Sequence, residues 1–128
     1  MAFPRVFCKS GTIAVADILT TATAPNTIVA ADPSKRYKIV DVDVRSQGNA
    51  DGSTAILVGA GAEVAWQMTT TDMDNLVINR ADSANVTATH LGHWSLANTP
   101  VSMLRTGTVT TTATTIDYVV WYLVEGGN

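Results

Sequence analysis

The sequence has little charge. Only 15% of its 128 residues are charged, with 8 Lys and Arg, 11 Asp and Glu, and a net charge of −3, whereas soluble domains typically carry about 25%. The basic residues are scattered along the chain, and proteins that bind nucleic acid or anionic membranes need theirs clustered. We therefore expect neither nucleic acid nor a membrane as a partner, and a surface so poor in charge favours contact with other protein chains.

Cysteine is nearly absent as well. The single cysteine, Cys8, excludes an internal disulfide framework and fits a protein made in a reducing cytoplasm. Long hydrophobic runs are also missing: no stretch of about 18 apolar residues occurs, and MAFPRVFCKSG has no apolar segment of secretory length. We expect neither export nor membrane insertion.

Side chains suited to catalysis are few. His90 and His93 are three residues apart, but they lie near a turn and no third ligand has a motif-like spacing. Asp41 and Asp43 would lie about 7 Å apart on one side of a strand, a separation that paired carboxylates use in glycoside hydrolysis. That side also carries Arg45 and is expected to be wet, so a solvated face is the favoured interpretation.

Two further motifs are incomplete. Asp72 and Asp74 resemble the start of a calcium loop, but the glycine at its sixth place and the glutamate at its twelfth are missing. The stretch of residues 59–61, Gly-Ala-Gly, lacks the third glycine and the helix of a dinucleotide site. We predict no catalytic, cofactor-binding or metal-binding residues, and we do not expect an enzyme.

Strand patterns are present along nearly the whole chain. In RYKIVDVDVRSQ, Val40, Val42 and Val44 alternate with polar residues, the period of a strand with one face in a core. The glycines and asparagine of QGNADGS then lead into TAILVG, which predicts a hairpin over residues 37–59. A helical turn in AVADILTTAT stays open, since alanine and leucine favour helix.

About eight such strands follow one another, without a helix long enough for a parallel crossover. This pattern predicts an all-β protein, an antiparallel β-sandwich that is jelly-roll-like. A chain of this length forms one domain. We place an N-terminal arm at residues 1–9 and a single β-sandwich domain at residues 10–128.

The last strand, DYVVWYLV, is apolar on both faces. One interpretation is a central strand with one face in the core and the other under a loop. The other is that one face meets another subunit, where tyrosine and tryptophan are common. We predict that Thr108–Thr115 forms its hairpin partner, with the turn at Ile116–Asp117. For the subunit interface we select three residues: Tyr118, Trp121 and Tyr122.

Three segments carry a resemblance to a known group. RYKIVDVDVRSQGNADGSTAILVG, the following AEVAWQM and the closing TTIDYVVWYLVE resemble small β-sandwich proteins encoded beside major capsid proteins in tailed bacteriophages, the head decoration or cement proteins. The resemblance covers most of the chain in general pattern, without an invariant motif. It implies a homotrimer that binds the major capsid protein on the outside of the phage head, at three-fold or quasi-three-fold positions, and stabilises the shell. It also implies a virion protein made in the host bacterial cytoplasm.

The N-terminal arm is the expected capsid contact. It holds both phenylalanines of the chain, and chain ends are usually ordered only where something ties them down. The arm could lie along a neighbouring subunit or the capsid, or it could be an edge strand folded back on its own sandwich. The candidate capsid-contacting residues are Phe3, Pro4, Arg5 and Phe7.

Other classes of function remain open from the sequence. A carbohydrate-binding module would present Trp66, Trp94 and Tyr37 on one exposed face. A small structural protein of the phage tail or fibre base would share the same weakly charged sandwich. A hydrolase of jelly-roll type would need its histidines and carboxylates to converge.

Overall fold

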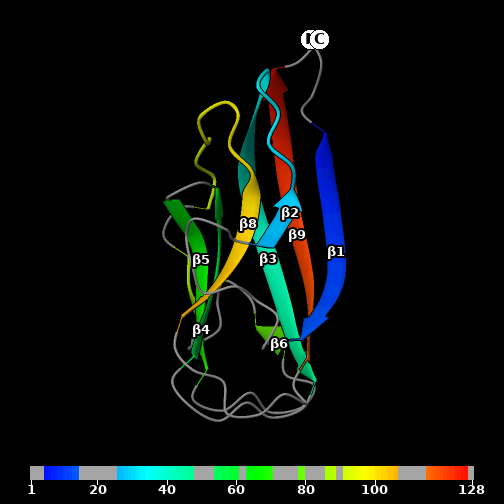
Figure 1. Ribbon diagram of the computed structural model, residues 1–128, viewed down its shortest axis with the longest axis vertical. Coiled ribbons are helices and arrows are strands. Elements are labelled where there is room, and N and C mark those ends of the chain that lie inside the picture. The colour runs from blue at the N-terminus through cyan, green and yellow to red at the C-terminus, as the bar shows by residue number, and fades with distance from the viewer. Residues whose placement is uncertain are drawn as a thin grey trace.

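The protein folds into two facing antiparallel β-sheets, as predicted. The computed structural model describes residues 5–14, 26–47, 54–60, 63–70, 78–79, 86–88, 91–106 and 115–126, and no helix that could cross a membrane occurs among them. In spatial order, sheet A consists of β1 (Val6–Ala14), β9 (Thr115–Gly126), β3 (Lys35–Gln47) and β6 (Ile78–Asn79). Sheet B consists of β2 (Asn26–Val29), β8 (Val101–Thr106), β4 (Thr54–Ala60), β5 (Glu63–Thr70) and β7 (Val86–Thr87). Figure 1 shows the two layers, with β1 at one margin.

One hydrophobic core lies between the sheets. Trp66 is its largest fully buried side chain, and Ile56 and Val58 of β4 face Val42 and Val44 of β3 within the same cluster. At roughly 25 cal/mol per Å² of apolar surface removed from water, each of these side chains stabilises the fold by about 1.5–3 kcal/mol. The remaining buried members are Ile28, Tyr37, Ile39, Ala65, Val101, Met103, Ile116 and Val120.

The positions of β3 whose side chains face the core change from odd to even in the middle of the strand. Tyr37 and Ile39 face the core at odd positions, whereas Val42 and Val44 face it at even positions. A β-bulge after Ile39 adds one residue opposite β9, and Val40 is the extra residue. The expected alternation is therefore correct for the two later valines, but Val40 is half-buried outside the core cluster.

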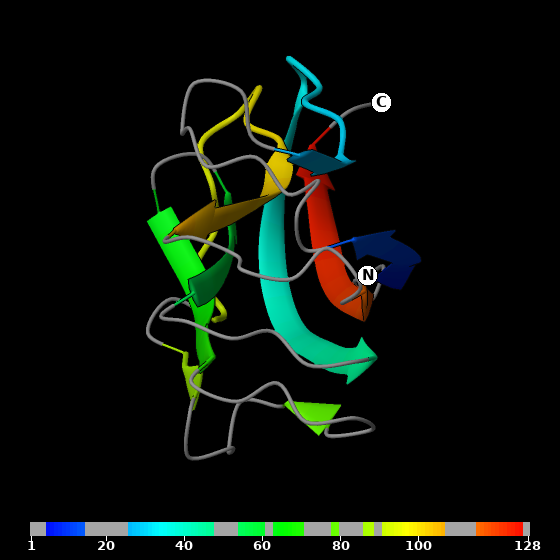
Figure 2. The same ribbon diagram turned by 60° about the horizontal axis from the view of Figure 1, so that its bottom comes forward.

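The hairpin predicted over residues 37–59 is wrong. Its two strands exist, but β3 belongs to sheet A and β4 to sheet B, where β4 pairs with β5 and β8. β9 and β6 take both edges of β3, and β8 and β5 take both edges of β4, so the apolar faces of the two strands meet across the core and not side by side. The two strands therefore lie in different layers, as Figure 2 shows.

β9 is one of the two central strands of sheet A. It pairs with β1 on one side and with β3 on the other over nearly its whole length. The predicted turn at Ile116–Asp117 is wrong, because both residues lie inside β9 and Ile116 is fully buried. Thr115 begins β9, and residues 108–114 of the expected partner strand lie outside the described residues.

The boundary expected between the N-terminal arm and the sandwich, after residue 9, falls inside β1. Val6–Lys9 are the first residues of β1 and pair with Val120–Leu123 of β9. Of the two arrangements left open for the arm, its described part is an edge strand of the chain's own sandwich. The physical reason is that backbone pairing with β9 extends the sheet without any loss of register.

Candidate functional site

An apolar stripe runs along the outside of sheet A. The outer stripe consists of Val6 and Cys8 of β1 together with Val119, Trp121 and Leu123 of β9. Directly opposed residues of an antiparallel pair lie on the same face, so Val6 lies beside Leu123 and Cys8 beside Trp121. Val6 is 56% exposed, and the three β9 side chains are half-buried. The second apolar face of β9 is therefore only partly covered.

Charged side chains border the stripe on the β3 side. Lys38 lies beside Leu123, and Asp41 lies beside Trp121. The Asp41 carboxylate also accepts a hydrogen bond from the backbone N–H of the next residue, Val42, at 2.9 Å. An apolar centre with a polar margin is the usual composition of a protein interface.

The three predicted interface residues do not share one surface. Trp121 lies on the outer face, whereas Tyr118 and Tyr122 point to the sandwich side and pack against the core. The Tyr118 phenol lies over Gly11, where a β-carbon would come within 2.6 Å of its oxygen. A tyrosine that covers a glycine of an edge strand supports that strand from within. Of the three, Trp121 alone lies on the outer face.

Tyr122 is the centre of an aromatic cluster at the β1 edge. Its ring stacks on Phe7 at 5.7 Å between centroids and meets Tyr37 edge-on at 5.8 Å. Tyr37 donates its hydroxyl hydrogen to the carbonyl of Ala30 at 2.8 Å. Burial is the main cause that raises the pKa of both tyrosines above the ordinary value, so both stay neutral at physiological pH.

Of the four candidate arm residues, the structure describes two. Phe7 lies in β1, 39% exposed at the margin of the sandwich, and Arg5 is exposed just before the strand. Phe3 and Pro4 lie outside the described residues. Phe7 is thus packed on Tyr122 from one side and open on the other.

The loop of residues 91–99 is held against β3 by two cationic side chains. Lys38 pairs with Trp94 through an isolated bridge, and its ammonium lies 4.7 Å from the centroid of the indole ring. The guanidinium carbon of Arg36 lies 5.3 Å from the same centroid, while its Nε donates to Glu125 at 3.0 Å. Cation–π contacts of this kind stabilise by about 0.5–1 kcal/mol at exposed sites. They hold the loop against sheet A.

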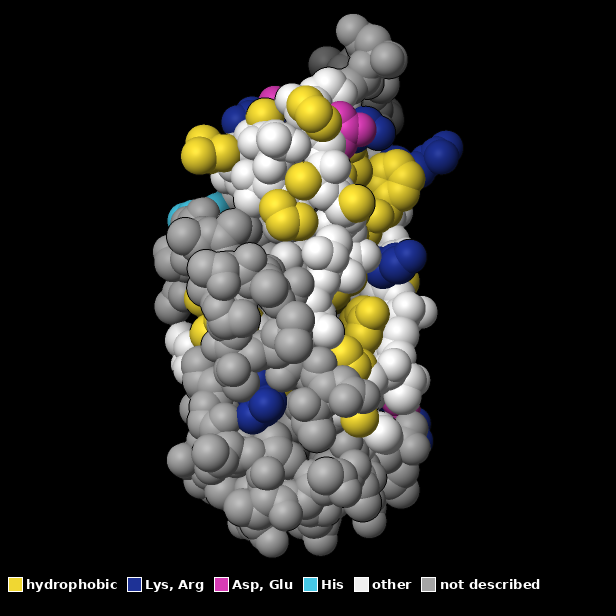
Figure 3. All heavy atoms as spheres, in the orientation of Figure 1, with side chains coloured by type: hydrophobic (Ala, Val, Ile, Leu, Met, Phe, Trp, Pro, Cys, Tyr) yellow, Lys and Arg dark blue, Asp and Glu magenta, His cyan; other side chains and the backbone are white. Residues whose placement is uncertain are grey.

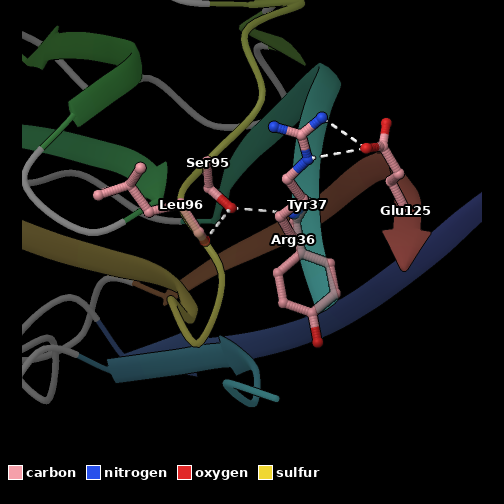
Figure 4. Close-up of polar contacts among 5 residues, drawn as sticks. All are labelled: Arg36, Tyr37, Ser95, Leu96 and Glu125. Carbon is pink, nitrogen blue, oxygen red and sulfur yellow. Dashed lines mark hydrogen bonds and ion pairs between the residues drawn. The ribbon is translucent and has the colours of Figure 1, made fainter. Parts of the chain in front are cut away.

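The same loop presents an exposed leucine. The buried hydroxyl of Ser95 accepts the backbone N–H of Tyr37 at 2.9 Å and donates to the carbonyl of Leu96 at 2.9 Å, as Figure 4 shows. The side chain of Leu96 is 82% exposed. Sequence reasoning missed Leu96, and the only available signal was a leucine among polar turn residues. Figure 3 shows hydrophobic side chains on the upper part of the described surface, with basic and acidic side chains between and beside them.

The candidate catalytic groups are not brought together where the structure describes them. His93 lies exposed in the loop, and Asp41 and Asp43 lie on sheet A. His90 and the carboxylates at 72 and 74 lie outside the described residues. Within the described ranges, no three His, Cys, Asp or Glu side chains are close enough to hold a metal ion.

The aromatic platform of a carbohydrate-binding module is not formed. Trp66 is fully buried, and Tyr37 is 4% exposed, both inside the core. Trp94 is half-buried and lies against two cations on the outside. The three candidates therefore do not present a common exposed face, because the few aromatic residues were needed to fill the sandwich.

Comparison with known proteins yields a likeness in structure. No protein-family model and no curated protein matches the sequence. Among solved structures, a chain of the "Cyanophage Pam1 capsid asymmetric unit" is similar, with a TM-score of 0.60 and 17% sequence identity; the match covers 94% of this chain and 85% of that chain. At this identity the likeness shows a shared β-sandwich fold.

Proposed function

We propose that the protein is a structural component of a bacteriophage capsid, a decoration or cement protein. It binds the major capsid protein on the outside of the head as a homotrimer and stabilises the shell, without catalysing a reaction. It is made in the host bacterial cytoplasm and resides on the virion.

One observation carries the proposal: the fold is shared with a chain of a capsid asymmetric unit over most of both chains. Each chain is therefore nearly filled by the same sandwich. The strand order supports this further. β1-β9-β3-β6 facing β2-β8-β4-β5, with the two-residue β7 added beside β5, is the order expected of two interleaved Greek keys. We propose that the sandwich is a jelly roll, an architecture that viral capsid proteins use.

The outer stripe supports the homotrimer. A half-buried tryptophan between apolar neighbours, with charges at one margin, matches the composition of the centre of an interface. We propose Trp121 as the centre of the subunit contact. Tyr118 and Tyr122 support the same surface from its inner side, where they pack against β1.

The stabilising effect follows from mass action. A ligand that binds only the assembled shell adds RT ln(1 + [L]/Kd) to its stability. Three linked copies attach with greater avidity than one, since the second and third contacts form at a high effective concentration. The weak charge of the surface fits this role, because short uncharged side chains lose little entropy when a contact orders them.

Co-sedimentation with capsids tests the proposal. The purified protein is mixed with expanded heads of its own phage that lack it, and we expect it to pellet with them and to raise their temperature of rupture. Trp121→Ser should dissociate the trimer, measured by light scattering, and weaken binding at least tenfold through lost avidity.

The matched control is Leu104→Ser. Leu104 is a half-buried leucine of a central strand, and it lies on the outer face of the other sheet, opposite Leu57. This variant should keep both the trimer and the binding. No pelleting of the unaltered protein, or equal losses in both variants, contradicts the proposal.

The N-terminal residues are tested separately. Deletion of residues 1–5 leaves β1 intact, since the strand begins at Val6. If the arm contacts the capsid, the deletion weakens binding and leaves the melting temperature unchanged. A fall in melting temperature with unchanged binding would assign these residues to the sandwich instead.

A further inference from the structure

β1 is the longest open strand edge in the part of the chain that the structure describes. It pairs with β9 on one side, and no described strand lies on its other side. It has nine residues, whereas the other edge strands, β2, β6 and β7, have four, two and two. An open edge carries a row of N–H and C=O groups that can pair with another chain.

The usual protection of an open edge is weak in β1. Native edges are blunted by proline, charges, bulges or a short length. VFCKSGTIA contains no proline, its register with β9 has no bulge, and Lys9 is its single charge. Its first five side chains are all exposed. The edge is therefore regular, accessible and nearly neutral.

The sequence of β1 is complementary to itself in the antiparallel direction. Alternate residues of a strand direct their N–H and C=O groups to the same side, so two copies can pair only if the two-fold axis passes through a residue. An axis at Lys9 would put two ammonium groups opposite each other, and an axis at Gly11 would leave Val6 and Phe7 unpaired. An axis at Ser10 pairs all nine residues.

In that register, the two outermost pairs are apolar and the charge meets a glycine. The pairs are Val6 with Ala14, Phe7 with Ile13, Cys8 with Thr12, Lys9 with Gly11, and Ser10 with Ser10 of the second copy. The two lysines then stand diagonally, roughly 7–8 Å apart. Each lysine also lies over the glycine that Tyr118 covers, where the phenol oxygen can accept a hydrogen bond.

We propose that two copies of the protein pair through β1 about a two-fold axis at Ser10, which joins their A sheets into one continuous sheet. The pairing covers the open side of Phe7 with Ile13 of the second copy. It uses the edge of sheet A, not the outer face around Trp121, so it can link molecules that are already held in trimers. The pairing goes beyond the proposed capsid role and does not depend on it.

Opposite charges at Ser10 test the pairing. Ser10→Glu and Ser10→Lys each place two like charges directly opposite each other, and we expect each to weaken association about fivefold or more. An equal mixture of the two variants should associate at least as well as the unaltered protein. Association is measured by sedimentation velocity, as a doubling of the mass of the smallest unit.

A disulfide tests the register. Thr12→Cys places a second thiol opposite Cys8 of the other copy, and mild oxidation should yield a covalent dimer on a non-reducing gel. Within one chain the two thiols are four strand residues apart, about 13 Å, too far for a disulfide. Thr12→Cys combined with Cys8→Ser is the control and should stay monomeric on the gel.

The outcomes separate the alternatives. If neither charge variant changes the association, the contact lies on another surface and the pairing is overturned. Equal cross-linking of the Thr12→Cys variant and of its control with Cys8→Ser would also overturn it. No association at all, together with free thiols in the Thr12→Cys variant, also overturns it. If the charge variants impair capsid binding without any self-association, the edge belongs to a strand of the capsid, and the proposed function survives while the pairing falls.

Discussion

The hydroxyl of Ser95 should determine how firmly the loop that carries Leu96 is held. Ser95 is 5% exposed, and its oxygen is the acceptor for the backbone N–H of Tyr37, a residue that is itself 4% exposed. Ser95→Ala removes that acceptor and also the hydrogen bond to the Leu96 carbonyl. The Tyr37 N–H is then left buried without its partner.

The expected loss follows from that orphaned donor. An unsatisfied buried backbone group costs about 1–3 kcal/mol, which places Ser95→Ala near 2 kcal/mol in the free energy of unfolding. For a chain of this size, that loss lowers the melting temperature by roughly 6–10 °C. Urea unfolding at fixed protein concentration, followed by tryptophan fluorescence, measures it, because Trp66 passes from a fully buried site to water.

Thr99→Ala is the matched control. Thr99 lies in the same loop, and its hydroxyl makes a single long contact of 3.4 Å with the Ala97 carbonyl. Its removal should change the free energy of unfolding by less than about 0.5 kcal/mol. A loss below 0.5 kcal/mol for Ser95→Ala, or the same loss for both variants, would refute the view that this hydroxyl fixes the loop to β3.

Three further predictions concern the core and the edge strand. Trp66→Ala should cost about 3–5 kcal/mol, measured by urea unfolding, since the residue is fully buried; a loss under 1 kcal/mol would contradict its place in the core. Gly11→Ala should lower the free energy of unfolding by about 1–2 kcal/mol, because its β-carbon would meet the Tyr118 phenol. This loss should be smaller when Tyr118→Val is also present, and an equal loss in both backgrounds would exclude that clash. Because burial raises the pKa of Tyr37 and Tyr122 above 10.0, stability is full below pH 10 and falls as the pH rises through the higher folded values; a flat profile in an alkaline series of thermal melts would contradict this.

The sequence by itself determined the class of the fold and a part of its core. Period-two alternation identified the strand around Val42 and Val44, because a half-buried strand places every second side chain in the core. Two apolar faces in DYVVWYLV likewise predicted a central strand, and β9 is one. These features depend only on neighbours along the chain.

The partners of the strands were decided by the tertiary structure alone. The tight-turn residues after β3 predicted a hairpin, yet the two strands lie in opposite sheets, since other strands occupy both edges of each. The bulge that moves Val40 out of the core has no local signal, because it arises from register with β9. The same holds for the tyrosines of β9: alternation placed Tyr118 and Tyr122 on the face opposite Trp121, but only the packed sheets made that face the interior. When both faces of a strand are apolar, the sheet that packs against the strand decides which face is buried. The pattern of residues along the strand is the same in either case and does not distinguish them.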